Sequence, residues 1–566
     1  MNIGNINNSL ITKCRSRMSV LTDTLRKNLA KTFVFRYFRV KTNYVINIKS
    51  NLASQLSWKS SPSTIVESGP RILVPLIETS HYQYYQVLAL AKALSVRGAK
   101  IKLLLCDSQL TGCELKSIRS SKFDPCLTCR FNHKNVIPFF DFDVVKLSDF
   151  ISKEQINAIR KKTKKITSKY PAKYVHNGVD IIPMTNDSVD RYYYGATPED
   201  FSAELKDIRE QHLETSMLGV TVARKIFEDW NPDQILGNMN VYSSWEPYLR
   251  VSTEKSIKFN LLSMSTFDYS KVVLNRQDLY LSDQRFLAWM ELRASKKILP
   301  NEREELVNFM QERFSGVSPI FKKHQVFKST GKKSNIDFLN IDPSKRNIFL
   351  FSNIYWDAGL AEYTSLYDGV VPWVLDTIDL LKNRNECHLY IKPHPAEVFD
   401  SSSSLKGVTD FIYERFPVLP KNVTIIAPEL KVKPYDLFSV IDVGVVYNGT
   451  LALEMLLRDI PVIGAGLAPY NHLNSLTNPE SRADYEKLLV GSRMVSKPNL
   501  DEVELFSYFY FIKSLIPWTL TEKSFGYDFK GFNFQSLDDL VPGQDKYLDH
   551  LCSCILDPKN TVVEGW

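Results

Sequence analysis

Short runs of β-branched and other apolar residues alternate with helix-length stretches twice along this chain, and this alternation constrains its fold more than any other feature. The first series begins at residue 71 and the second at residue 346. Strands separated by helices are typical of parallel sheets covered by helices, as in Rossmann-like domains. At 566 residues the chain is also too long for one hydrophobic core. The sequence therefore predicts an α/β protein with two Rossmann-like domains that face each other across a cleft.

The expected strands and helices follow from the same pattern. In the first series, a strand, a helix that ends before Gly98 and a second strand form a βαβ unit. Its strands are expected at 71–77, 100–106, 234–238 and 258–263, with a helix at 86–96 and mostly helical sequence at 150–230. In the second series, strands are expected at 346–353, 387–392, 423–427, 443–447 and 461–464. Ligands of such sheets bind at the carboxyl ends of the strands, so a site is expected there.

Five segments follow from this pattern. A basic N-terminal extension is expected at 1–66, and a first, acceptor-binding Rossmann-like domain at 67–325. The stretch 326–345 is polar and contains glycine, as interdomain linkers do. A second, donor-binding Rossmann-like domain is expected at 346–500, and a helical C-terminal segment at 501–566.

Positive charge is concentrated at the N-terminus. Residues 1–60 contain eleven Lys and Arg side chains and one Asp, so they contribute +10 to a net charge of +8 and leave the rest of the chain at −2. A nucleic-acid-binding fold would carry a basic patch on the folded domain, so no nucleic-acid partner is expected. Two interpretations of the basic arm stay open: a solvated extension, and peripheral contact of residues 13–59 with an anionic membrane.

Neither a membrane-spanning segment nor a secretory signal is visible in the sequence. No run of about 18 apolar residues occurs, and the N-terminus lacks the apolar core of an export signal. We therefore expect a cytoplasmic protein, and membrane contact through the arm would place it at the inner face of the membrane.

The first candidate binding segment follows the strand expected at 387–392. Lys392 and His394 are separated by Pro393 and followed by Pro395, and the two prolines restrict the backbone of this loop. A rigidly placed cation and imidazole suit a phosphate leaving group, whose negative charge must be neutralised as a bond breaks. We therefore expect Lys392 and His394 to bind the phosphates of a donor.

A second candidate segment is the turn Asn448-Gly449-Thr450, which lies between an apolar strand and a helix. Backbone N–H groups at the start of a helix and a Thr hydroxyl together favour an anion. Glu454 lies one helical turn further on, where we expect it to reach a ribose hydroxyl. Thr450 also fits a plain helix cap.

Together these segments resemble the C-terminal half of bacterial capsule-polysaccharide-biosynthesis glycosyltransferases, a group that includes Kdo-transferase-like enzymes. The resemblance rests on the motifs at 351–357, 392–397, 448–454 and 461–466, and extends over roughly residues 70–495. It implies the GT-B fold, two Rossmann-like halves that act on a nucleotide sugar. It also implies that the sugar passes to a glycan or lipid-linked saccharide acceptor. The family often has Ser-Thr where this chain has Gly449-Thr450, so one hydroxyl contact to the donor is missing.

Transfer to an acceptor hydroxyl also requires a general base. In the architecture implied by the resemblance, the base follows the first strand of the first domain, which makes Glu78 and His81 the catalytic candidates and Asp107 a third. No Asp-x-Asp metal motif lies next to a predicted strand. We therefore expect catalysis without a metal or other cofactor, with Lys392 and helix dipoles stabilising the leaving group.

Four of the eight cysteines are clustered. Cys106, Cys113, Cys126 and Cys129 have the spacing C-x6-C-x12-C-x2-C. A structural zinc site takes four ligands in closely spaced pairs, and only Cys126 and Cys129 have that spacing. The resemblance implies a structural role for these cysteines. A structural zinc or other thiolate-bound metal, ordinary free cysteines and a redox pair all remain open.

The function has alternatives as well. Transfer of a polyol phosphate from a CDP-alcohol uses a similar His-Pro loop and similar halves, but leaves phosphate in the new linkage. A non-catalytic nucleotide-binding scaffold and a nucleotide-sugar epimerase share the architecture. The sequence favours the glycosyltransferase.

Overall fold

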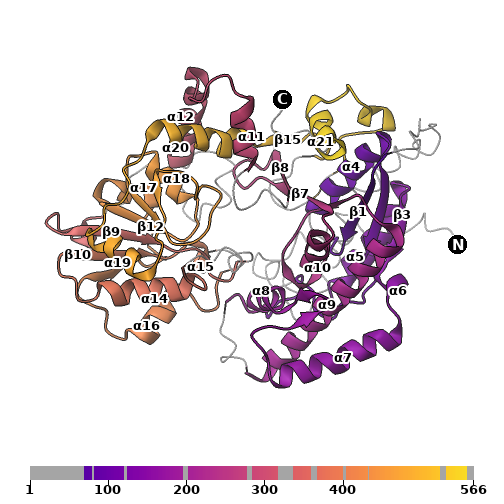
Figure 1. Ribbon diagram of the computed structural model, residues 1–566, viewed down its shortest axis with the longest axis horizontal. Coiled ribbons are helices and arrows are strands. Elements are labelled where there is room, and N and C mark those ends of the chain that lie inside the picture. Colours follow the sequence, from indigo (N-terminus) through magenta and orange to yellow (C-terminus); the bar gives the residue numbers. More distant parts are fainter. Residues whose placement is uncertain are drawn as a thin grey trace, which may run out of the picture.

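The computed structural model describes residues 69–79, 82–119, 124–195, 202–276, 284–315, 336–357, 366–399, 403–430, 432–522, 529 and 531–557. The expected basic extension 1–66 and its membrane contact at 13–59 lie outside the described residues, and so does His81. The described chain forms two lobes, each built around a β-sheet (Figure 1). Among the described helices, none has the combination of length and apolar character needed to cross a lipid bilayer.

The first lobe contains a seven-stranded sheet with the order β15-β8-β7-β6-β1-β2-β3. Its strands are β1 (Arg71–Leu76), β2 (Lys100–Leu105), β3 (Asp143–Lys146), β6 (Gln234–Gly237), β7 (Lys258–Met264), β8 (Lys271–Arg276) and β15 (Ile516–Pro517). Strands β3, β2, β1, β6 and β7 run parallel to one another. At the other edge of the sheet, β8 pairs antiparallel with β7, and β15 pairs antiparallel with β8. The helices of this lobe are α4 (Tyr82–Val96), α5 (Cys126–Asn135), α6 (Leu147–Phe150), α7 (Lys153–Ser168), α8 (Ile182–Tyr193), α9 (Ser202–Trp230) and α10 (Tyr242–Glu254).

The second lobe contains a six-stranded, fully parallel sheet with the order β11-β10-β9-β12-β13-β14. Its strands are β9 (Arg346–Phe351), β10 (Cys387–Lys392), β11 (Val423–Ile425), β12 (Val443–Val446), β13 (Val462–Gly464) and β14 (Leu476–Thr477). Its helices include α14 (Val370–Leu381), α15 (Ala396–Phe399), α16 (Val408–Arg415), α17 (Pro434–Leu437), α18 (Leu451–Leu456) and α19 (Arg482–Val490). Numbered along the chain, this strand order is 3-2-1-4-5-6, the order of the Rossmann fold.

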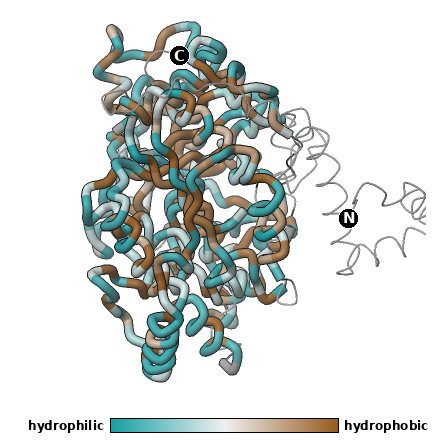
Figure 2. Tube along the Cα trace, turned by 90° about the vertical axis from the view of Figure 1, so that its right-hand side faces the viewer, coloured by the Kyte–Doolittle hydropathy of each residue, from teal (hydrophilic) through white to brown (hydrophobic). Residues whose placement is uncertain are grey.

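These two sheets confirm the predicted α/β class and the pair of Rossmann-like domains, the arrangement called GT-B. Each sheet is stabilised by burial of apolar residues on both faces, as expected for parallel strands. Helix α4, for example, contacts three strands of the first sheet and also packs against a helix from the far end of the chain, so eleven of its fifteen residues are buried. Figure 2 shows hydrophobic segments running through the middle of the molecule and hydrophilic segments at its periphery.

The expected boundary of the first domain at residue 325 does not match the packing. Helices α11 (Gln284–Leu292) and α12 (Pro300–Ser315) contribute Phe286, Trp289 and Leu306 to the core that contains β9 and β10 of the second lobe. Their apolar residues therefore belong with the second domain. The expected linker 326–345 falls partly outside the described residues.

The C-terminal segment expected at 501–566 does not form a separate helical element. Helix α20 (Leu500–Tyr508) packs in the second lobe, and the chain then returns to the first lobe, where β15 pairs with β8. Beyond β15, Trp518 and helix α21 (Lys546–Leu556) enter the core around α4. In Figure 1 this yellow segment covers the first lobe next to α4. The chain therefore crosses between the lobes a second time near residue 514.

Candidate functional site

Each sheet has a topological switch point, where the strand order reverses and ligands of Rossmann-like folds bind. In the second lobe it lies between β9 and β12, and in the first between β1 and β6. Side chains that directly follow these strands are therefore the candidates for a functional site. Most of the residues singled out from the sequence lie at one of these two edges.

The carboxyl ends of four strands are level with one another in the second sheet. Lys392 pairs with Phe351, Phe351 with Val446, and Val446 with Gly464, so these residues form one row across β10, β9, β12 and β13. The loops that follow the four strands therefore begin side by side. The structure thus brings the Lys392-His394 loop and the Asn448-Gly449-Thr450 turn to the same edge.

Lys392 is the most unusual side chain at this edge. It is 2% exposed, and among the described residues its Nζ has no hydrogen-bond partner. Burial lowers the pKa of the ammonium group from 10.5 to about 8. A buried, unpaired cation is costly unless an anion compensates it. Lys392 therefore favours a negatively charged ligand at the end of β10.

His394 is exposed two residues further on, at the start of α15. Its Nδ1 accepts a hydrogen bond from the backbone N–H of Ala396 at 3.2 Å. Because Nδ1 acts as an acceptor, the neutral ring carries its proton on Nε2. The loop thus fixes the orientation of the imidazole, and Nε2–H lies on the opposite side of the ring from Ala396.

The turn after β12 is held by contacts from two neighbouring loops. Asn353, which follows β9, donates from Nδ2 to Oδ1 of Asn448 at 2.9 Å, directly across the switch point. The hydroxyl of Tyr470 donates to the carbonyl of Gly449 at 2.6 Å. Thr450 occupies the cap position of α18, but its side chain makes no capping hydrogen bond. Its hydroxyl is therefore not used to cap the helix, which was the alternative role considered for it.

Glu454 is not placed as expected. It lies on the inward face of α18 and is 1% exposed. Its Oε1 accepts a hydrogen bond from Nε of Arg313 at 2.9 Å, within an ion pair between the two side chains. The carboxylate thus joins α18 to α12, and the prediction that it binds a ribose is replaced by a structural role.

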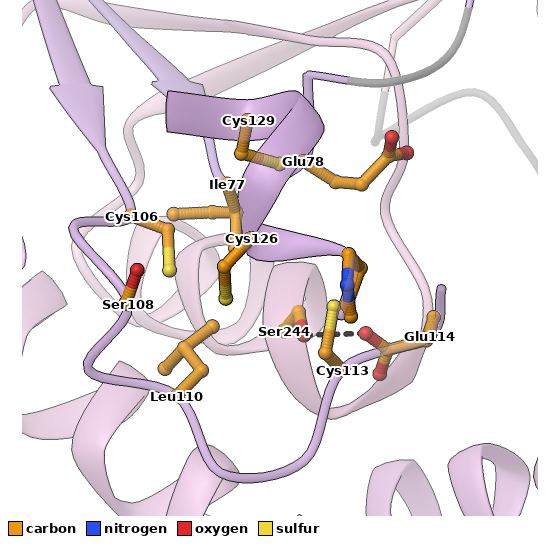
Figure 3. A pocket seen from close by; sticks show the side chains of 11 residues that line it. Ile77, Glu78, Cys106, Ser108, Leu110, Cys113, Glu114, Cys126, Cys129 and Ser244 are labelled. Atoms are coloured by element: carbon orange, nitrogen blue, oxygen red, sulfur yellow. Dashed lines mark hydrogen bonds between the residues drawn. The ribbon is translucent and has the colours of Figure 1, made fainter. Parts of the chain in front are cut away.

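In the first lobe, Glu78 lies just after β1, at the switch point. It is 7% exposed and lines a small pocket that also contains all four clustered cysteines (Figure 3). Asp107 follows β2, and its Oδ1 is buried without a hydrogen-bond partner among the described residues. The structure therefore brings two of the three candidate bases to the carboxyl edge of the first sheet.

The four cysteines converge although they come from separate segments. Cys106 follows β2, Cys113 lies in the next loop, and Cys126 and Cys129 are one turn apart at the start of α5. All four are free thiols. Within the described residues, no three His, Cys, Asp or Glu side chains are already arranged to hold a metal ion.

The carboxyl edges of the two sheets meet. The N–H of Leu405 donates to the carbonyl of Tyr194 at 3.0 Å, and the rings of Tyr194 and Trp356 pack edge to face at 5.3 Å. Tyr242, which starts α10 after β6, has a left-handed backbone with φ of 72° and interacts electrostatically with Asp357 beyond β9. Because these contacts join the two lobes, the two candidate edges face each other. The left-handed backbone of Tyr242 is also of the strained kind that concentrates at functional sites.

Sequence reasoning did not assign roles to Asn353, Tyr470 or Glu114. Asn353 carries a recognisable signal, because it is a polar residue just after the first strand of a Rossmann-like unit. Tyr470 contacts Gly449, and the buried carboxylate of Glu114 accepts hydrogen bonds from the hydroxyls of Ser188 and Ser243, each at 3.0 Å. No local pattern marks these two residues, because their partners lie far away in the sequence.

No protein-family model matches this chain, and no curated protein matches it in sequence. Among solved structures, it resembles KpsC from Thermosulfurimonas dismutans, described as a beta Kdo 2,4 transferase, at 14% identity over 49% of this chain and 79% of that one, with a TM-score of 0.31. It also resembles the glycosyltransferase SnogD from Streptomyces nogalater, at 10% identity over 78% and 95% of the two chains and a TM-score of 0.20. A third is the UDP-GlcNAc 2-epimerase of Neisseria meningitidis bound to UDP-GlcNAc, at 10% identity over 70% and 82% and a TM-score of 0.19. Likeness at this level does not assign an activity to the chain.

Proposed function

We propose that this protein is a glycosyltransferase that moves a sugar from a nucleotide-sugar donor to a glycan or lipid-linked saccharide acceptor. The observation that carries the proposal is the buried, unpartnered ammonium of Lys392 at the carboxyl edge of the second Rossmann-like sheet. The sequence resemblance to enzymes of capsule-polysaccharide biosynthesis supports a surface polysaccharide as the product.

On the donor side, Lys392 neutralises the phosphates of the nucleotide, and an N–H of His394 donates to one of their oxygens. Both interactions strengthen as charge builds up on the leaving phosphate, which is the requirement for catalysis. Asn448, Gly449 and Thr450 provide the neighbouring wall through backbone N–H groups and the Thr450 hydroxyl. No metal or cofactor is required in this scheme.

On the acceptor side, Glu78 is the general base. It lies at the switch point of the opposite sheet, and buried carboxylates near a reacting hydroxyl are suited to accept its proton. Asp107 is the alternative at the neighbouring strand. His81 remains a candidate from the sequence.

The test is a transfer assay with purified protein, a panel of nucleotide sugars and a pool of saccharide acceptors, followed by nucleotide release and mass spectrometry of the product. Wild type should release nucleotide only when an acceptor is present. Lys392→Met keeps the length of the side chain and should slow release by about 100-fold or more, the usual effect of removing one charge-stabilising donor. Lys382→Met, at the exposed residue that directly follows α14, is the matched control and should behave as wild type.

Three results would count against the proposal. Equal activity in wild type and Lys392→Met would remove its main support. Phosphate in the product linkage would instead identify a polyol-phosphate transferase, and conversion of a donor without acceptor would identify an epimerase.

A further inference from the structure

Helix α7 and the turn that follows it carry a dense cluster of positive charge on the first lobe. Residues 153–173 contain eight Lys and Arg side chains and a single acid, Glu154, which gives a net charge of +7. The chain beyond residue 60 has a net charge of −2, so this segment is an isolated positive region in an otherwise acidic body. Neither the proposed donor site nor the proposed general base uses any of these side chains.

One face of α7 is buried, and the opposite face is exposed. The buried residues recur three and four positions apart and are Ile156, Ile159, Thr163 and Ile166. The three isoleucines belong to the core that also contains Leu213 and Met217 of α9. The opposite face of the helix carries Lys161, Lys164 and Lys165, all of them exposed. Because α7 lies along the outer edge of the first lobe (Figure 1), this lysine face points away from the body of the protein.

Neighbouring acids do not neutralise the lysine face. Among the residues that the structure describes, Lys161, Lys164 and Lys165 form no ion pair. Arg160 does form one, with 2.9 Å between its Nε and Oε1 of Glu214. Like charges three and four residues apart repel each other on a helix, and a face that served only solubility would mix both signs. An anionic partner would relieve this repulsion.

The chemistry of the lysine face favours anionic lipid over other polyanions. Lysine is a flexible point charge, whereas arginine is the usual residue for fixed, bidentate recognition of a phosphate. α7 contains no aromatic side chain on which the bases of a single-stranded nucleic acid could stack. Its 16 residues present a straight face about 24 Å long, which suits a flat layer of headgroups. Clusters of Lys and Arg on an amphipathic helix are typical of binding sites for anionic headgroups.

We propose that the lysine face of α7 is a docking surface for a bilayer that contains anionic lipids. The ammonium groups of Lys161, Lys164 and Lys165 lie against the headgroup phosphates, and the buried face of α7 keeps its packing on α9. Residues 1–60 carry a further +10 in the same chain. Two basic segments that are linked bind one surface more tightly than either does alone, so α7 and the N-terminal segment reinforce each other.

The test measures co-sedimentation of the full-length protein with vesicles of equimolar phosphatidylglycerol and phosphatidylcholine, and with vesicles of phosphatidylcholine alone. Wild type should bind the anionic vesicles, and binding should weaken as sodium chloride screens the charges. A triple variant with Lys161→Gln, Lys164→Gln and Lys165→Gln keeps good helix formers in α7. Its apparent Kd for the anionic vesicles should rise by about tenfold or more, because each lysine near an anionic surface adds to the attraction.

Two further triple variants serve as controls. Replacement of the same three lysines by Arg conserves the charge and should preserve binding. The second control removes an equal charge from the second lobe and should also bind as wild type does. Its exposed lysines, each replaced by Gln, are Lys421, Lys487 and Lys497.

Equal binding of wild type and the α7 glutamine variant would overturn the proposal, and so would equal binding to vesicles with and without phosphatidylglycerol. Binding to soluble dextran sulfate but not to the anionic vesicles would also overturn it and would identify a soluble polyanion as the partner. Should the α7 variant fail to fold, acetylation of wild type decides the question. Anionic vesicles should protect Lys161, Lys164 and Lys165 from acetylation, and a lack of protection would contradict docking. These measurements require neither nucleotide nor acceptor, so they succeed or fail separately from the proposed function.

Discussion

Lys392 is the residue on which the account depends most. Its folded-state pKa of about 8 lies below the ordinary 10.5, so the unfolded chain binds the proton more tightly than the folded protein does. The charged lysine therefore lowers the free energy of unfolding at pH 7 by about 3 kcal/mol, and this loss disappears as the pH rises from about 8 to 10.5.

Replacement of Lys392 by Met should accordingly stabilise the ligand-free protein at pH 7. We expect the free energy of unfolding in urea to rise by about 1–3 kcal/mol, with a difference from wild type that shrinks between pH 8 and 10. Lys382→Met should show no such pH-dependent difference. A destabilised Lys392→Met variant would mean that the ammonium has a partner in the folded protein.

Gly449 offers a gain-of-function test at the neighbouring turn. A Cβ atom added here would meet nothing closer than the Asn353 side chain, at 3.9 Å. Gly449→Ser should therefore fold normally and supply the hydroxyl that is frequent at this position in the family that the sequence resembles. We expect the Kd for a nucleoside diphosphate to fall about fivefold, the effect of one added hydrogen bond of about 1 kcal/mol. Gly449→Ala is the matched control, and an equal change in both variants would argue against a hydroxyl contact.

How far the sequence predicts individual residues depends on what places them. Lys392 and His394 follow a strongly apolar strand, so their position at the sheet edge could be predicted. The environment of Glu454 could not, because the sequence did not show that Arg313, 141 residues earlier, would pair with its carboxylate. The roles of Lys392, His394, Asn448, Gly449, Thr450 and Glu78 stay predictions until they are measured.

At the scale of elements, the loop after β2 is fixed by the buried carboxylate of Glu114. Glu114→Ala would leave the hydroxyl of Ser244 without its acceptor and would remove one acceptor from the hydroxyls of Ser188 and Ser243. Buried donors without acceptors are costly, so the free energy of unfolding should fall by about 1–3 kcal/mol. Glu228→Ala, at an exposed position in α9, should stay within about 0.5 kcal/mol of wild type. An equally small effect of Glu114→Ala would show that the loop is held by its other contacts.

The central strands of both sheets and the edge strand β11 could be predicted, whereas the other edge strands, β3, β14 and β15, could not. β1, β10 and β12 are apolar runs covered on both faces, and their observed bounds agree with the predicted ones within one residue. β14 and β15 have two residues each, too few to give a periodic signal. β3 has only two valines between a charged residue at each end, so its sequence resembles that of the loops around it.

At the scale of the molecule, the C-terminal return links the two lobes. Trp518 lies in the core of the first lobe although it follows the last helix of the second, and its Nε1 donates to the hydroxyl of Thr521 at 2.8 Å. The sequence did not reveal the return of the chain to the first lobe. Its apolar composition stays the same where the chain leaves one core and enters the other.

Trp518→Ala should therefore destabilise the first lobe by about 3 kcal/mol or more, the usual cost of truncating a buried tryptophan. Calorimetry should show the loss, while any stabilisation by nucleotide, for which we propose a site in the other lobe, should persist. Val418→Ala, at a position that is 86% exposed, provides the control. Loss of nucleotide binding in Trp518→Ala would show that the lobes do not act separately.

The most direct test of the account is a thermal-shift measurement with nucleoside mono- and diphosphates of cytidine, uridine, guanosine and thymidine. A ligand that binds the folded state alone raises the unfolding temperature, because its stabilisation of the folded state grows with the logarithm of its concentration divided by its Kd. We predict that at least one of them stabilises wild type and Lys382→Met but not Lys392→Met. Absence of any shift in wild type, or an equal shift in Lys392→Met, would contradict a donor site built on Lys392.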